Sequence, residues 1–112
     1  IILGGSYKGS DFTALAEELS YHQATKALLI GDEAVRIAKA CNAVGFRNYE
    51  VMEQATAEGF TRRASELASP GDIVLLSPAA ASFGLFRNYV DRGEQYIAAV
   101  RQLQVKNETS CN

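Results

Sequence analysis

The chain has 112 residues, of which 47% are hydrophobic and 21% charged, so we expect one globular domain and no extensive disorder. Eleven basic and thirteen acidic residues give a net charge of −2, which argues against a nucleic-acid-binding module, since such modules carry a basic excess. The longest apolar runs, such as residues 27–30, are too short to span a bilayer, so no membrane partner is expected.

The first half of the chain alternates short apolar runs with helical patterns. We expect strands at residues 1–3 and 26–30 and a weaker one within residues 46–51. Asp11 and Asp32 are placed to cap two helices between these strands, because a carboxylate can accept a hydrogen bond from the first backbone N–H groups of a helix. The apolar residues at helical spacing are Phe12, Leu15, Ala16 and Leu19 in the first helix and Ala34, Ile37, Ala38 and Cys41 in the second.

The second half continues this alternation. Residues 52–68 predict a longer helix, residues 69–72 a turn, and residues 73–76 the most clearly buried strand. The expected inner face of the longer helix consists of Met52, Ala55, Phe60, Ala64 and Leu67. The expected inner stripe of a last helical region consists of Tyr96, Ile97, Val100 and Leu103. Arg92-Gly93 reads as a helix break, and residues 105–112 read as a frayed polar tail.

Helices alternating with strands that are apolar on both faces predict an α/β fold with a mostly parallel sheet flanked by helices. Ligands bind such sheets at the carboxyl ends of the strands. Two segments lie there, residues 4–9 after the first strand and residues 77–82 after the last. In the first, Lys8 near a helix N-terminus suits a carboxylate or phosphate, and in the second, Ser82 could cap a helix and hold an anion. Spacing alone leaves two structural interpretations open, namely that Lys8 is only solvated and that Ser82 is an ordinary helix cap.

The glycine-rich first segment does not fit either nucleotide-binding template. A phosphate-binding P-loop needs Gly-Lys-Ser/Thr, whereas Lys8 precedes Gly9, and a dinucleotide fingerprint needs a glycine where Ser6 stands. We therefore expect no nucleotide to be bound by this segment alone.

The remaining reactive side chains have structural interpretations. Cys41 lies on an apolar helical face and Cys111 in a polar segment, which is typical of free thiols in a reducing cytosol, so a cytoplasmic location is expected. The single histidine, His22, lies at the end of a helix and reads as a surface residue. No Cys or His cluster has the spacing of a metal site.

Three stretches resemble one family in order and spacing. Residues 76–93 read LSPAAASFGLFRNYVDRG, residues 3–12 read LGGSYKGSDF, and residues 70–77 read PGDIVLLS. Together they resemble the C-terminal, amino-acid-binding domain of the Mur ligase family, which has a Rossmann-like fold. The resemblance covers residues 1–104. Two positions depart from the family: Ala80 stands where Cys is common, and Gly84 stands where an acidic residue is common.

The resemblance implies an ADP-forming ligase of peptidoglycan precursor synthesis. In such an enzyme, ATP phosphorylates the carboxylate of UDP-N-acetylmuramoyl-L-alanine, and the amine of D-glutamate attacks the acyl phosphate with the assistance of Mg²⁺. The resemblance implies that ATP, Mg²⁺ and the UDP-linked substrate bind to N-terminal and central domains upstream of this chain. The isolated domain would then hold no cofactor and be inactive.

The resemblance also assigns substrate-binding residues, none of them catalytic. Lys8 would pair with a carboxylate of D-glutamate, Ser82 and the Phe83 N–H would bind a carboxylate, and Tyr89 would help to form the pocket wall. The chain opens inside an expected strand with Ile1 and no initiating Met, so we expect it to be one domain of a longer polypeptide. The alternatives are a separate flavodoxin-like or receiver-like binding or regulatory module, and half of a dinucleotide-binding enzyme.

Overall fold

The computed structural model describes residues 1–4, 11–31, 33–52, 56–78 and 89–110, with the backbone alone at residues 78, 89 and 104–110. The strands are β1 (Ile2–Gly4), β2 (Ala27–Ile30), β3 (Tyr49–Met52) and β4 (Leu76–Pro78), all paired in parallel in the order β3-β2-β1-β4. The helices are α1 (Thr13–Ser20), α2 (Ala34–Ala43), α3 (Ala57–Leu67) and α4 (Tyr89–Ser110). The prediction of an α/β fold with a parallel sheet flanked by helices, a Rossmann-like arrangement, is confirmed.

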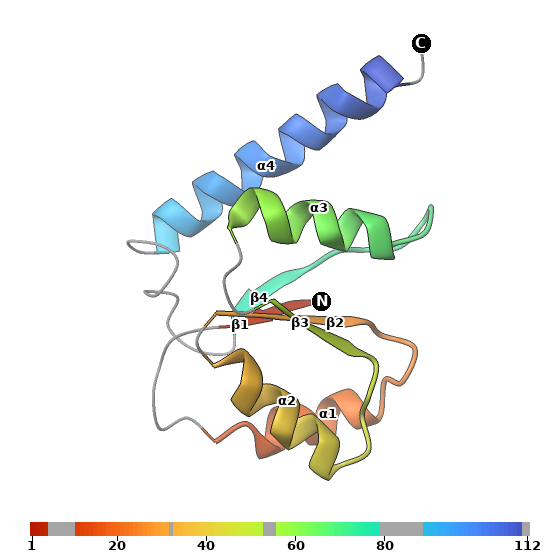
Figure 1. Ribbon diagram of the computed structural model, residues 1–112, viewed down its shortest axis with the longest axis vertical. Coiled ribbons are helices and arrows are strands. Elements are labelled where there is room, and N and C mark those ends of the chain that lie inside the picture. Colours follow the sequence, from red (N-terminus) through yellow and green to blue (C-terminus); the bar gives the residue numbers. More distant parts are fainter. Residues whose placement is uncertain (5–10, 32, 53–55, 79–88, 111–112) are drawn as a thin grey trace.

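The sheet lies between two layers of helices, with α1 and α2 on one face and α3 and α4 on the other (Figure 1). Successive strand residues point to opposite faces, so a strand covered on both sides must be apolar throughout. Leu3 and Leu29 accordingly belong to the core on the α1 and α2 side, whereas Ile2, Leu28 and Ile30 belong to the core on the α3 side.

The first two helices present the faces that the sequence predicts. The residues buried on these faces are Phe12, Ala16, Leu19, Ala34, Ile37, Ala38 and Cys41, and Leu15 is half-buried. Asp11 precedes α1, and its carboxylate accepts hydrogen bonds from the Thr13 N–H at 2.9 Å and the Thr13 hydroxyl at 2.6 Å. Asp32, the cap expected for the second helix, lies outside the described residues. Gly45, with a φ of +80°, follows the end of α2, as expected of a residue that tolerates a left-handed backbone.

The third helix starts later than the sequence predicts. Met52 is the last residue of β3 and pairs with Ile30 of β2, so its assignment to the helix was wrong. The helix begins at Ala57 because the hydroxyl of Thr56 accepts a hydrogen bond from the Gly59 N–H at 3.1 Å. Phe60 and Ala64 are buried as expected and Leu67 is half-buried, while Ala55 lies outside the described residues.

The prediction that residues 73–76 form the most buried strand was wrong. The turn before them is confirmed, since the Asp72 N–H donates to the Ser69 carbonyl at 3.0 Å and the Ser69 N–H donates to the Asp72 carboxylate at 2.8 Å. However, Ile73 is 91% exposed, and the strand begins only at Leu76. Strand β4 is at the edge of the described sheet, and the exposure of residues 73–75 shows that neither helix layer covers them.

The last helix is longer than the sequence predicts. It runs without interruption through Gly93, so the expected break was wrong, and it includes most of the segment expected to be a frayed tail. A glycine inside a helix costs about 1 kcal/mol, which the packing of a 22-residue helix can offset. Tyr96 packs on Phe60 with 6.2 Å between ring centroids, and Ala99 is buried, but Ile97 is exposed rather than part of the inner stripe.

Candidate functional site

The strand order places a topological switch point between β1 and β4. The chain moves in one direction across the sheet from β1 to β2 to β3, and α3 then returns it to the opposite side of β1. In open α/β sheets, ligands bind outside the carboxyl ends of the strands at the point where the direction reverses. The candidate site is therefore the carboxyl edge of β1 and β4.

The two segments selected from the sequence begin at this edge, although their first residues still belong to the strands: Gly4 is in β1, and Ser77 and Pro78, expected to follow the last strand, are in β4. Gly4 and Pro78 end their strands and are partners in the parallel register of β1 and β4. The segment that carries Lys8 follows Gly4, and the segment that carries Ser82 and Phe83 follows Pro78. The structure thus brings together the starting points of both segments.

The predicted binding residues themselves lie mostly outside the described part of the chain. Lys8, Ser82 and Phe83 are not among the described residues. The same holds for Ala80 and Gly84, the two positions that differ from the residues common in the family. Tyr89 is the first residue of α4, where the backbone alone is described. Their roles remain predictions.

Charged residues that the sequence analysis did not single out border the same edge. Glu33 is the residue before α2, and its side chain is only 5% exposed. Its carboxylate accepts a hydrogen bond from the Arg36 guanidinium at 2.6 Å, and that guanidinium lies 5.6 Å from the centre of the Phe12 ring. Because Phe12 and Glu33 precede α1 and α2, this group joins the N-terminal ends of two neighbouring helices. An acidic residue just after a strand, followed at i+3 by an arginine, is the sequence signal that could have revealed it.

Asp11 adds a second carboxylate near this edge. The hydroxyl and the N–H of Thr13 both donate to it and lower the pKa of Asp11, with a smaller contribution from the charge of Arg36. Asp11 is therefore held in its ionised form close to the start of α1, where a negative charge is favourable.

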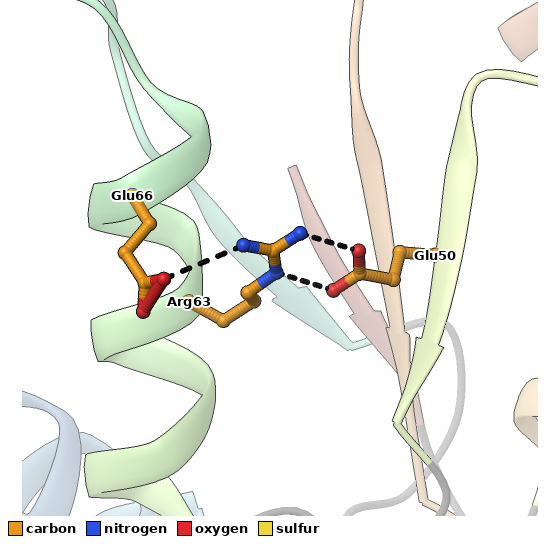
Figure 2. A network of polar contacts seen from close by, with 3 residues as sticks. All are labelled: Glu50, Arg63 and Glu66. Atoms are coloured by element: carbon orange, nitrogen blue, oxygen red, sulfur yellow. Dashed lines mark hydrogen bonds and ion pairs between the residues drawn. The ribbon is translucent and has the colours of Figure 1, made fainter.

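The ion-pair network of Arg63 lies away from this edge and serves the fold. Arg63 of α3 donates to both carboxylate oxygens of Glu50 in β3 at 2.6 and 2.7 Å, and it reaches Glu66 at 3.4 Å (Figure 2). These hydrogen bonds lower the pKa of Glu50 and raise the pKa of Arg63. A bidentate pair of this kind fixes both partners in orientation, so it attaches α3 to the edge strand.

A cavity of about 290 Å³ lies at the opposite, amino edge of the sheet. It is bordered by Ile1, Lys26 and the end of α3 near Ala68, together with Asp72 and Ile73. Ligands of parallel sheets bind at the carboxyl edge, so we do not assign the functional site to this cavity.

The following properties concern the described residues alone. Among them, no group of three or more His, Cys, Asp or Glu is arranged to hold a metal ion. None of the helices formed by these residues combines the length and the apolar character needed to cross a membrane. Cys41 is a free, buried thiol whose pKa is raised by burial, and His22 is exposed beside Glu18, as predicted.

Comparison with known proteins identifies the relatives of this chain. It is 45% identical over 103 residues to the UDP-N-acetylmuramoylalanine–D-glutamate ligase of Bordetella pertussis, a match that covers 92% of this chain. The proteins of the same name from Thiobacillus denitrificans and Acinetobacter baylyi are 44% and 38% identical over 103 residues each, again covering 92% of this chain. The chain is a relative of these D-glutamate ligases. The resemblance to the Mur ligase family is thereby confirmed.

The match concerns one part of each ligase. The chain spans about a fifth of the length of the ligase relatives, 19% of the Bordetella pertussis protein and 22% of the Acinetobacter baylyi protein. A scan against protein-family models gives no match. The similarity therefore relates this chain to a segment of the size of one domain within larger ligases.

Proposed function

We propose that this chain is the C-terminal, D-glutamate-binding domain of a cytoplasmic UDP-N-acetylmuramoylalanine–D-glutamate ligase. The observation that carries the proposal is the identity of 38–45% over 92% of the chain to proteins of that name. The placement of Gly4 beside Pro78 supports it, because the segments with Lys8 and Ser82 then start at one edge of the sheet.

The proposed division of labour leaves the phosphoryl chemistry to other parts of the ligase. ATP and Mg²⁺ would bind there and supply the acyl phosphate of UDP-N-acetylmuramoyl-L-alanine. This chain would hold D-glutamate so that its amine faces that acyl phosphate. Lys8 would pair with one carboxylate of D-glutamate, Ser82 and the Phe83 N–H would bind a carboxylate, and Tyr89 would form part of the wall. Such positioning can lower a reaction barrier by several kcal/mol.

No observation favours a second function. A flavodoxin-like module has the strand order 2-1-3-4-5, whereas the described strands follow β3-β2-β1-β4, which agrees with the first four strands of the dinucleotide-binding order 3-2-1-4-5-6. Fold alone does not determine function, and the first loop lacks a dinucleotide fingerprint because Ser6 stands at a glycine position.

The test uses the complete ligase that contains this chain. It measures the rate of ADP release as a function of the concentration of each substrate. We expect ADP release to depend on D-glutamate, and we expect Lys8→Ala and Ser82→Ala each to lower kcat/KM for D-glutamate by about 10- to 150-fold. Lys39→Ala and Ser65→Ala, at exposed helix positions, are the matched controls. ADP release without any D-glutamate dependence would refute the function, and unchanged D-glutamate kinetics in both variants would refute the residue assignments.

A further inference from the structure

Glu33 is a buried carboxylate at the carboxyl edge of the sheet. It stands three residues after the end of β2, immediately before α2, and its side chain is 5% exposed. Burying a carboxylate is costly unless a cation and hydrogen bonds compensate it. Arg36 supplies that compensation at 2.6 Å, while its own side chain remains 45% exposed.

Arg36 connects this carboxylate to the start of α1. Its guanidinium lies 5.6 Å from the centre of the Phe12 ring, within the range of a cation–π contact. Phe12 is buried in the core and immediately precedes α1, so the contact fixes the point at which the chain enters that helix. One end of the segment that carries Lys8 is therefore attached to the junction of β2 and α2.

The other end of the same segment is attached to the same junction. Gly4, the last residue of β1, lies so close to β2 that a Cβ added to it would stand 2.4 Å from the Ile30 carbonyl oxygen. Ile30 is the last residue of β2, three positions before Glu33. Both anchors of residues 5–10, Gly4 and Phe12, thus contact the short stretch from Ile30 to Arg36.

We propose that Glu33 and Arg36 are positioning residues that set the placement of Lys8 for D-glutamate binding. This inference rests on the proposed function. Glu33 orients the guanidinium, the guanidinium holds Phe12, and Phe12 together with Gly4 fixes the two ends of the connecting segment. Neither Glu33 nor Arg36 needs to touch the substrate.

The chemistry of arginine makes the proposal specific. A planar guanidinium can donate hydrogen bonds to a carboxylate and lie against an aromatic ring at the same time. A lysine ammonium cannot make both contacts in the same geometry. Arg36→Lys keeps the charge and loses this geometry. It should therefore restore only part of the function lost in Arg36→Ala, whereas a purely electrostatic role would be restored fully.

The experiment measures steady-state kinetics of the complete ligase. Arg36→Ala is expected to raise KM for D-glutamate about tenfold, with KM for ATP and for the UDP-linked substrate unchanged. Glu33→Gln and Phe12→Leu should move KM for D-glutamate in the same direction. The matched control is Arg62→Ala, which removes an arginine from an exposed pair with Glu58 at 2.9 Å on α3, and its KM values should not change.

Combining variants separates this inference from the function on which it rests. If Arg36 acts through Lys8, Arg36→Ala should have little further effect on KM for D-glutamate in a Lys8→Ala background. Equal effects in both backgrounds would overturn the inference, as would unchanged D-glutamate kinetics in both Arg36→Ala and Phe12→Leu while Lys8→Ala is impaired. If Lys8→Ala itself leaves both KM and kcat/KM for D-glutamate unchanged, the proposed role of Lys8 is refuted, and the inference falls with it.

Discussion

Gly4 and Pro78 lie opposite each other in the register of β1 and β4, although they are far apart in the sequence. Each residue ends its strand, so the segments that follow leave the sheet from adjacent positions. Pro78 cannot donate a backbone hydrogen bond, and it is tolerated because β4 is at the edge of the described sheet. This relationship places the two predicted binding segments at one switch point.

The close approach of β1 to β2 makes Gly4 intolerant of a side chain. In Gly4→Ala, the new Cβ would stand 2.4 Å from the Ile30 carbonyl oxygen, a backbone atom that can move only with its strand. We expect the free energy of unfolding of the chain, measured by urea denaturation, to fall by about 1–3 kcal/mol.

The control for this substitution is another glycine. A Cβ at Gly93, inside α4, would meet no atom within 4 Å. Gly93→Ala should therefore raise the free energy of unfolding by about 0.5–1 kcal/mol, because alanine is the better helix former. Equal effects of the two substitutions would contradict the close approach of β1 to β2.

The Glu50–Arg63 pair predicts a pH-dependent contribution to stability. Hydrogen bonds from Arg63 lower the pKa of Glu50 in the folded chain below its unfolded value. The pair therefore stabilises the fold fully above about pH 5, and its contribution is lost as the pH falls through the lowered pKa of the folded state. Glu50→Gln should reduce the urea midpoint at pH 7, and the difference from the unchanged chain should shrink below about pH 4.

Glu58→Gln is the matched control for that measurement. Glu58 pairs with Arg62 on the exposed surface of α3, where an ion pair contributes little. Its substitution should shift the midpoint at pH 7 less than Glu50→Gln does. A loss in Glu50→Gln that is the same at pH 7 and pH 3.5 would show that the charge of Glu50 is not responsible.

The exposure of residues 73–75 can be tested by comparing two isoleucines. Ile2 is fully buried in β1, whereas Ile73 is 91% exposed before β4. Ile2→Ala should lower the free energy of unfolding by about 2–5 kcal/mol, and Ile73→Ala should change it by about 0.5 kcal/mol or less. A large loss in Ile73→Ala would show instead that residues 73–76 are buried, as the apolar run had suggested.

The sequence alone predicted the elements whose local pattern and burial agree. Residues 1–3 and 26–30 are apolar on both faces, and the structure places strands at nearly the same positions. The inner faces of α1 and α2 were also predicted, because apolar residues at helical spacing become a buried stripe once a sheet is present. The three stretches that resemble Mur ligases predicted the relatives found by comparison.

The errors arose where long-range contacts override a local pattern. Met52 fits a helical stripe, but pairing with β2 makes it part of β3, and the Thr56 cap starts the helix later. Residues 73–75 are as apolar as a core strand, which predicted burial. They are exposed because burial also requires a covering helix layer, and neither layer covers them. Gly93 suggests a break, but α4 continues through it because the helix packs as a whole on α3.

The amino-acid sequence determined the fold class and the two segments after β1 and β4, because both depend on residue types and spacing within short stretches. Only the tertiary structure decided that Gly4 lies beside Pro78 and that Arg36 links Glu33 to Phe12. Strand order and such contacts depend on where α3 carries the chain after β3 and on which helix ends meet. Neither leaves a periodic signal in the sequence, since the residues involved are joined through space rather than along the chain.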